Sequence, residues 1–565
     1  MISANQEEKG RVPASMEAEQ KETLLDAKEV AKAVGSAVGG EGAKKVGAVM
    51  VLDRDIDATV PLKGAKQQVP PGNWTGALAF AVFAVTLSSF QFGYHIGCVN
   101  APGELITKFI TRSHKELFGT QLTKEKADVV WAVAVSMFAV GGMIGGLLSG
   151  WTADRFGRKG ALLLNNLLAF IAAALMGLAK TVNVYPMIII GRLIIGINCG
   201  LASGLVPMYL TEVSPINLRG MIGSIHQLLV TISILISQIF GLPYLLGSEK
   251  LWPLIFAFTV VPSVLQLCTL PLCPESPKYS QVVKNLSDQA EKDLKKLRAS
   301  DDVSAELLGM QEEAMQVQTV PKVRMLDMFK GALKWPLSIA VMMMLSQQLS
   351  GINVAMFYST VIFKGAGLTG LAPFYATIGM GAVNVIMTII SVWLVDHPKF
   401  GRRSLHLIGL TGMLISSLFI VLSLSLFEAG KQGLNKPNTN QWSSYAAIGF
   451  VLLFVISFAT GPGAIPWFFV SEIFSSGARG NANSIAVMVN WMANLLVGLT
   501  FLPINNAIGQ YSFFVFSAFL AFFIAYTWKF VPETKGRTVE DIQKEFAAQG
   551  HGGVPASEAK SAEEQ

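Results

Sequence analysis

The sequence predicts an all-α membrane protein with twelve transmembrane helices. Hydrophobic residues make up 52% of its 565 residues and charged residues only 15%, whereas soluble domains average about 25% charged residues. Twelve apolar segments approach the ~20 residues needed to span a bilayer, so the lipid bilayer is the first expected partner. They lie at roughly 75–98, 127–150, 160–180, 185–210, 220–242, 251–271, 334–363, 371–395, 404–427, 443–468, 481–503 and 510–530.

The distribution of charge predicts the orientation. Net charge is +6, and basic residues concentrate in the short loops of one side, as in Asp154-Arg155-Phe156-Gly157-Arg158-Lys159 and Arg402-Arg403. By the positive-inside rule this basic side is cytosolic, and an even number of spans then places both termini there. The loop at 101–126, on the other side, mixes Lys and Glu. We therefore expect a multi-pass plasma-membrane protein.

The remaining polar segments divide the chain. Residues 1–70 and 532–565 have no long apolar run and are expected to be cytosolic tails, the first of them disordered. A polar segment at 274–333 separates spans six and seven, and 286–297 and 305–315 within it have amphipathic helical patterns. The expected units are thus two six-helix bundles, 75–273 and 334–531, joined by a cytosolic helical linker.

Three motifs recur in the same order in both bundles. Phe156-Gly157-Arg158-Lys159 returns as Phe400-Gly401-Arg402-Arg403, and Pro274-Glu275-Ser276 returns as Pro532-Glu533-Thr534. Between them, Glu212 and the following Arg219-Gly220 return as Glu472 and Arg479-Gly480. A duplicated bundle is typical of transporters whose substrate site lies near the bilayer midplane, between two halves that rock.

Three amides in one apolar span indicate the kind of substrate. Gln347, Gln348 and Asn353 lie within Ser346–Asn353, and uncharged amides at membrane depth are costly unless they meet polar partners. They donate and accept hydrogen bonds without carrying charge, which suits a neutral polyhydroxyl molecule such as a sugar. On a regular helix the three do not share a face, so Gly351 is expected to interrupt it. The alternative is that the amides only tie helices together.

Charged groups at the basic side predict a gate. Glu212 lies at a helix C-terminus and Arg219 at a helix N-terminus, and Glu472 and Arg479 repeat this placement, which opposes the helix dipole. We expect these groups to pair across the cytosolic face, with Arg158 and Arg403 as partners of the carboxylates. The alternative is ordinary surface charge. The candidate gate residues are Asp154, Arg155, Arg158, Glu212, Arg219, Arg402, Arg403, Glu472 and Arg479.

The motifs resemble those of the facilitative glucose transporters, in the sugar-porter branch of the major facilitator superfamily, over about 75–542. The matching residues include Gln91-Phe92-Gly93-Tyr94, Gly191-Arg192, Pro207-Met208-Tyr209, His226-Gln227-Leu228, Gln347 to Asn353, Gly461-Pro462-Gly463, Ile465-Pro466-Trp467 and Pro532-Glu533-Thr534. The resemblance implies the major facilitator fold and uniport of D-glucose or a related hexose. It also implies that Gln347, Gln348, Asn353, Gln227, Asn384 and Asn490 contact the sugar, as do Trp467 and, beside Asn490, Trp491; membrane-interface anchoring is the alternative for a Trp.

Departures from the family pattern leave the selectivity open. Met344 replaces a Gln, and Ala459 stands where many members carry Glu, so fructose or mixed-hexose transport is the second expectation after glucose. His95 stands where uniporters are expected to carry Asn and proton-coupled relatives often carry Asp. Arg192 nearby would favour a neutral His95 that only forms hydrogen bonds, with proton-coupled symport as the alternative.

Other classes of function find no support in the sequence. The six His residues form no HExxH or similar metal cluster, and no Walker-type loop is present. We therefore expect no enzymatic activity, no cofactor, no nucleotide and no nucleic acid. A non-transporting sugar sensor is a further alternative, although the tails contain no recognisable signalling module.

Overall fold

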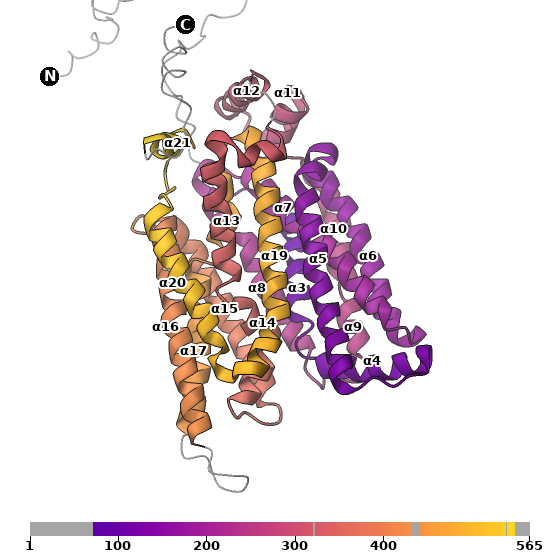
Figure 1. Cartoon of the computed structure of the whole chain (residues 1–565). Coiled ribbons are helices and arrows are strands. Elements are labelled where there is room, and N and C mark those ends of the chain that lie inside the picture. The colour runs from indigo at the N-terminus through magenta and orange to yellow at the C-terminus, as the bar shows by residue number, and fades with distance from the viewer. Residues whose placement is uncertain (1–71, 320–322, 431–440, 538, 549–565) are drawn as a thin grey trace, which may run out of the picture. The chain divides into compact units, whose positions relative to one another are not determined.

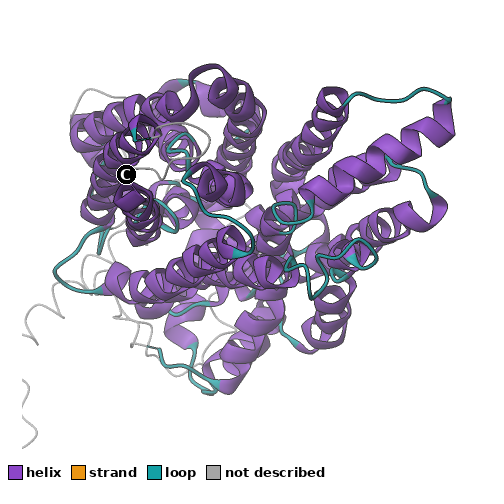
Figure 2. Ribbon diagram, turned by 90° about the horizontal axis from the view of Figure 1, so that it is seen from below, coloured by secondary structure: helices purple, strands orange, loops and turns teal. Residues whose placement is uncertain are grey.

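Every regular element that the structure describes is a helix. The computed structural model describes residues 72–319, 323–430, 441–537 and 539–548, and Figure 2 shows helices joined by loops throughout them. Twelve helical stretches in these ranges are long and apolar enough to cross a membrane. The predicted fold class is confirmed. The tail predicted at 1–70 and the end of the chain beyond 548 lie outside the described residues.

The helices follow the predicted order (Figure 1). Those of the first half are α3 (Gly76–Gly97), α4 (Gly103–Phe118), α5 (Lys124–Phe156), α6 (Arg158–Val182), α7 (Pro186–Val213), α8 (Arg219–Phe240), α9 (Trp252–Ala257) and α10 (Val260–Thr269). Two helices fall in the linker, α11 (Ser287–Arg298) and α12 (Ser304–Thr319). The second half contains α13 (Lys334–Gln348), α14 (Ile352–Gly365), α15 (Ala372–Asp396), α16 (Arg402–Ala429), α17 (Gln441–Thr460), α18 (Ile465–Ile473), α19 (Ser476–Ile508), α20 (Phe513–Phe530) and α21 (Val539–Ala548).

Three of the predicted spans are each built from two helices. The seventh breaks between α13 and α14 at Gly351, whose φ of +91° is left-handed and favours glycine. The tenth breaks between α17 and α18 at Gly461-Pro462-Gly463, where proline cannot continue the hydrogen-bond ladder. The sixth breaks between α9 and α10. The interruption that the sequence predicted at Gly351 is confirmed.

The two halves meet along glycine-lined helices. Gly142, Gly146 and Gly150 follow one another at intervals of four residues on α5, so they share one face of the helix. A side chain at Gly142 would come within 2.2 Å of Trp491, and one at Gly146 within 2.6 Å of Val487, both on α19. Small residues in such rows let transmembrane helices approach closely. The second contact between the halves joins α8 to α15.

The two ends of the bundle are distinct. Helices α11, α12 and α21 gather at one end, which we call the linker end, and α4 lies at the other, the opposite end (Figure 1). The segment 101–126 was predicted to be a loop, and the helix α4 within it corrects this prediction. Its buried residues Ile106, Phe109, Ile110 and Ser113 follow helical spacing, so the signal was present but the segment is short and charged.

The break at Gly351 is directly testable. Gly351→Ala should destabilise the protein by about 1–3 kcal/mol, because the backbone is left-handed there and an added Cβ would lie 2.7 Å from the Phe516 ring. The measurement is the apparent melting temperature in detergent. Gly449→Ala, with open space around it within α17, is the matched control and should not lower it. Equal melting temperatures for both variants would contradict the assigned role of the break.

Candidate functional site

Four amide side chains meet inside the second half. The Nε2 group of Gln348 donates to Oδ1 of Asn490 at 2.9 Å, and Nδ2 of Asn490 donates to Oε1 of Gln347 at 2.7 Å. Asn353 donates to Oε1 of Gln348. All four side chains are buried, at 2–7% exposure. We call these residues, Gln347, Gln348, Asn353 and Asn490, the amide cluster.

The break between α17 and α18 completes the amide cluster. Nε2 of Gln347 donates to the backbone carbonyls of Pro462 at 3.0 Å and Gly463 at 2.8 Å. Because the helix is interrupted there, these carbonyls are available for side-chain donors. The break at Gly351 in turn brings Asn353 back towards Gln348, from which it would be turned away on a continuous helix. The result is a dense set of uncharged donors and acceptors.

Trp467 links this region to the first half. It is the third residue of the nine-residue helix α18, directly after the break. Its ring contacts Phe92 of α3 edge-on at 6.4 Å and His226 of α8 at 5.7 Å, measured between ring centroids. His226 is held by Ser89, whose Oγ lies 2.8 Å from Nδ1. Aromatic side chains from both halves therefore meet at Trp467, shortly after the two residues whose carbonyls bind Gln347.

Trp491 occupies the contact between the halves. It lies against Gly142, its ring is 5.2 Å from those of Phe92 and Phe138, and its Nε1 donates to Oγ of Ser203 at 3.2 Å. Only 1% of the residue is exposed. Trp491 was predicted to contact the sugar, but in this conformation its indole N–H is bonded to Ser203 and its ring packs against Gly142, Phe92 and Phe138 of the first half. Its position is that of a seal between α5 and α19.

Two further predicted sugar contacts, Gln227 and Asn384, stay outside the amide cluster. Gln227 on α8 is 9% exposed, and its side chain makes no hydrogen bond to any residue that the structure describes. Asn384, the middle residue of α15, is 2% exposed, and its Oδ1 has no partner among the described residues. Both amides thus retain unused hydrogen-bonding capacity in the interior.

The two residues that depart from the family pattern line the interior with apolar groups. Met344 lies one helical turn before Gln348 on α13, and its Sδ is 3.5 Å from Nδ2 of Asn490. Ala459, near the end of α17, is buried. Neither side chain supplies the strong hydrogen-bonding group that Gln or Glu would place there.

His95 and Arg192 contact each other through the backbone. Nη1 of Arg192 donates to the carbonyl oxygen of His95 at 3.0 Å, and the guanidinium lies 4.3 Å from the Phe138 ring centroid. Nε2 of His95 lies 2.6 Å from Oγ1 of Thr259. No salt bridge joins Arg192 to a carboxylate within the described ranges. The His95 ring is therefore held by a hydroxyl group within the first half.

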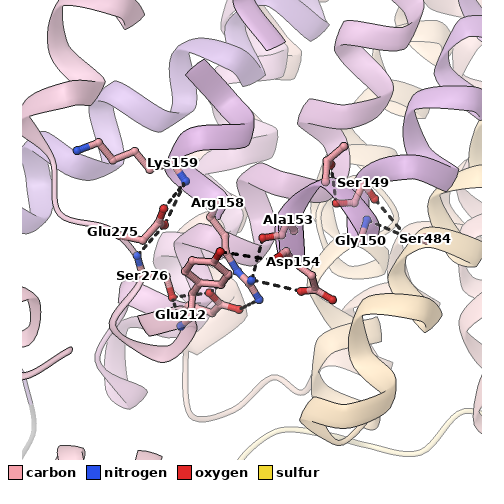
Figure 3. Close-up of polar contacts among 12 residues, drawn as sticks. Ser149, Gly150, Ala153, Asp154, Arg158, Lys159, Glu212, Glu275, Ser276 and Ser484 are labelled. Atoms are coloured by element: carbon pink, nitrogen blue, oxygen red, sulfur yellow. Dashed lines mark hydrogen bonds and ion pairs between the residues drawn. The ribbon is translucent and has the colours of Figure 1, made fainter. Parts of the chain in front are cut away.

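A compact polar network organises the linker end of the first half (Figure 3). Arg158 binds both oxygens of Glu212, from Nε and from Nη2, each at 2.9 Å. Oγ of Ser276 donates to Glu212, and Arg158 also lies 3.4 Å from Asp154. Glu275 accepts the backbone N–H of Lys159 at 3.1 Å. Burial raises the pKa of the Glu275 carboxyl, although the N–H groups that it accepts favour its charged form.

The second half repeats this network and corrects one predicted pair. Arg402, and not Arg403, faces Glu472 at 3.5 Å, and Thr534 donates to Glu472 as Ser276 does to Glu212. Glu533 accepts the backbone N–H of Arg402 at 2.7 Å. Arg403 instead donates to the backbone carbonyl of Trp528. The position within the repeated motif explains why Arg402 is the partner of Glu472, because Arg158 and Arg402 both directly follow the glycine of that motif.

The Arg–Glu pairs lie within each half, so other residues join the halves at the linker end. Oδ2 of Asp396 on α15 accepts the backbone N–H of Met221, in the first turn of α8, at 2.8 Å. Oγ of Ser484 on α19 accepts the N–H of Gly150 at 3.1 Å (Figure 3). The sequence analysis missed both. Asp396 could have been found, because it precedes the second Phe-Gly-Arg-Arg motif much as Asp154 precedes the first.

The remaining predicted gate residues play smaller parts. Arg479 donates to the carbonyl of Phe474, in the same segment, at 3.2 Å. Arg155 and Arg219 are exposed and make no hydrogen bond to a described residue. Within the described ranges no hydrogen bond joins these three residues to Glu212 or Glu472, but Arg479 interacts electrostatically with Glu212, and Arg219 with Glu472.

At the opposite end, Asn100 joins the halves. Its Nδ2 donates to Oγ of Ser359 at 2.8 Å and to the carbonyl of Met356 at 3.1 Å, and its Oδ1 accepts from Thr360 at 2.8 Å. Lys364 pairs with Glu104 at 2.9 Å nearby. Asn100 follows α3, and its three partners lie on α14. No sequence pattern singled it out.

Comparisons with known proteins agree with this geometry. The family model "Sugar (and other) transporter" matches residues 80–546. The chain is 71% identical over 477 residues to facilitated glucose transporter protein 1 of Caenorhabditis elegans, covering 84% of this chain and 92% of that one. It is 43% identical over 479 residues to the human solute carrier family 2, facilitated glucose transporter member 3, covering 85% and 94%.

Solved structures show the same fold. The proton:xylose symporter XylE bound to 6-bromo-6-deoxy-D-glucose matches with a TM-score of 0.71 at 26% identity, over 83% of this chain and 98% of that one. The inward-open conformation of XylE from E. coli matches with a TM-score of 0.62 at 28% identity, over 83% and 99%. These relatives are transporters rather than enzymes, and the chain belongs with the facilitated glucose transporters, in the sugar transporter family of the major facilitator superfamily.

Proposed function

We propose that this protein carries D-glucose or a related hexose down its gradient across the plasma membrane, by exposing one interior site alternately to the two sides. The observation that carries the proposal is the uncharged amide cluster, enclosed by contacts between the halves at both ends. Amides match the donors and acceptors of a neutral sugar, and they neither attract nor require an ion. Relatives named as facilitated glucose transporters support glucose as the first choice.

The orientation follows from the charges. We place the linker end and both termini in the cytosol, since the basic loops lie at that end. Residues 75–273 and 334–531 are then the two halves that rock, with the linker at 274–333 between them. The Arg158–Glu212 and Arg402–Glu472 pairs tie helix ends together within each half, so that each half moves as a unit.

The sugar must exchange hydrogen bonds with the site. In the present conformation the amide cluster is satisfied by its own members and by the carbonyls of Pro462 and Gly463. Sugar hydroxyl groups replace some of these bonds, so the cost of desolvating the amides is not incurred at the moment of binding. Gln227 and Asn384 supply unused amides, and the face of Trp467 suits the C–H groups of the sugar.

Two interior positions favour a second candidate for the transported hexose. Met344 and Ala459 leave two interior positions without strong hydrogen-bonding groups. Fructose or mixed-hexose transport is therefore the alternative to strict glucose transport. Uptake of glucose, fructose, galactose and xylose by the purified protein in liposomes distinguishes the two.

Truncating the central amide should weaken sugar binding. Gln347→Ala removes hydrogen bonds to the sugar and leaves Asn490 and two carbonyls short of partners. We expect a loss of about 1–3 kcal/mol, roughly ten- to hundredfold in affinity. Glucose binding to the purified protein measures it. Gln289→Ala, on the exposed face of α11, is the control, and unchanged binding by a folded Gln347→Ala protein would rule out this role.

Removing the carboxylate between the halves should open the linker end. Asp396→Ala deletes an acceptor at the N-terminus of α8, a contact worth about 0.5–2 kcal/mol, or roughly two- to thirtyfold in the ratio of closed to open protein. Labelling of Ser484→Cys by an impermeant thiol reagent, in a Cys268→Ser background, reports the opening. Asp128→Ala, exposed at the opposite end, is the control. Equal labelling rates in the two variants would argue against a gate at Asp396.

Transport should not be coupled to protons. The ring of His95 is held by Thr259, and Arg192 is bonded to the backbone of His95. Both observations favour a neutral imidazole that stays in place through the cycle. Proteoliposomes with an imposed pH gradient should therefore equilibrate glucose without accumulating it. Uphill accumulation driven by the gradient, and its loss in His95→Asn, would establish symport instead.

A further inference from the structure

Gln238 is a buried amide without a hydrogen-bonding partner. It lies on α8, two residues before the helix ends at Phe240, and only 4% of it is exposed. Neither Nε2 nor Oε1 meets a partner among the residues that the structure describes. Buried amides usually find partners, because an unsatisfied one is costly. A group kept at such a cost in one conformation is expected to be satisfied in another.

The side chain of Gln238 points across the contact between the halves. An added Cβ at Gly381 on α15 would lie 2.2 Å from Oε1 of Gln238, so the amide rests against the α15 backbone. Asn384 is three residues further along α15, on the same face of the helix. Its Oδ1 is also without a partner. Two unsatisfied amides from opposite halves therefore share the α8–α15 contact.

Gln238 is also aligned with the predicted sugar site. It follows Gln227 by eleven residues on the unbroken helix α8, which is close to three turns, so the two side chains leave the same face. The separation along the axis is roughly 16 Å, towards the opposite end. Asn384 lies at the middle of α15. The amides of Gln238, Asn384 and Gln227 thus form a row from near the opposite end to the interior.

We propose that Gln238 forms an outer sugar subsite, with Asn384 shared between it and the main site, and that a hexose occupies this subsite on its way between the opposite end and the amide cluster. This inference rests on the proposed function. When the halves separate at the opposite end, each amide can exchange hydrogen bonds with the hydroxyl groups of a passing sugar. When they close, the subsite is emptied and its amides lose their partners. Gly381 leaves room for the Gln238 side chain.

The test is the response of Gln238→Leu to a set of sugars. We expect a two- to tenfold rise in KM for D-glucose entering from the opposite end, the effect of losing one hydrogen bond. The rise should disappear for the one monodeoxy-D-glucose that lacks the hydroxyl group contacted by Gln238. The melting temperature should stay equal or increase, because an unsatisfied amide has been replaced by an apolar side chain of similar size.

A second pair of variants tests the same proposal in case Gln238→Leu does not fold. Gly381→Ala places a methyl group against Oε1 of Gln238 and should displace the amide, reproducing the same dependence on the sugar. Gly379→Ala, on the same helix with nothing within 4 Å of the added Cβ, should transport all the sugars as the unmodified protein does.

The outcomes separate three cases. An equal rise in KM for every sugar would mean that Gln238 only biases the conformation, and would overturn the subsite. Unchanged KM values would mean that water satisfies the Gln238 amide in all conformations, and this result would also overturn the subsite. If the unmodified protein takes up no hexose, the proposed function fails, whereas uptake with either of the first two results refutes the subsite alone.

Discussion

Hydrocarbon offers no hydrogen bonds, and this constraint governs the whole interior of the protein. Every backbone polar group at membrane depth must find its partner within the bundle. The break between α17 and α18 exposes the carbonyls of Pro462 and Gly463, and Gln347 satisfies both. Gln347 also accepts a hydrogen bond from Asn490, which accepts one from Gln348, so a local interruption of one helix is linked to two others, α13 and α19. The amide cluster thus forms around backbone carbonyls that need hydrogen-bond donors.

The two halves of a transporter must separate at one end and then at the other. The polar contacts within each half therefore differ from those between the halves. Bidentate or doubly supported pairs, such as Arg158–Glu212 with Ser276, lie within one half. The contacts between the halves are simpler: Asp396 accepts one N–H group, Ser484 accepts another, and Asn100 bonds to α14. The Lys364–Glu104 ion pair also joins the halves, but both side chains are exposed to solvent, where such pairs contribute little. Charge-assisted pairs are the stronger class. Strong bonds therefore preserve each half, and weaker ones are left to break and re-form during the cycle.

Glycines set how closely the halves approach. The row Gly142, Gly146 and Gly150 lets α19 lie against α5, and Trp491 fills the space above Gly142. Because the large aromatic side chain comes from one half and the missing side chains from the other, the seal is formed only in the closed arrangement. Unsatisfied amides at the other contact, Gln238 and Asn384, have the reverse effect, since they favour separation.

Much of the fold could be predicted because its signals are local. Apolar segments of spanning length, the repeated Phe-Gly-Arg motif and the left-handed requirement at Gly351 are each contained in a few residues. The short amphipathic helix α4 was missed because a charged segment obscured its pattern. For the site, the amides of α13 could be identified by their cost at membrane depth, and Asp396 by its place before the repeated motif, but no sequence pattern marks Asn100.

By itself, the sequence determined the membrane environment, the twelve spans, the duplication and the residue types of a neutral site, since hydropathy, repetition and amide chemistry do not depend on distant contacts. Only the tertiary structure decided which groups meet. It assigned Arg402 rather than Arg403 to Glu472, placed Trp491 in the contact between α5 and α19, and placed the Gln238 amide against Gly381 of α15. These choices depend on the packing of helices far apart in the chain, which the spacing of residues along one helix does not encode.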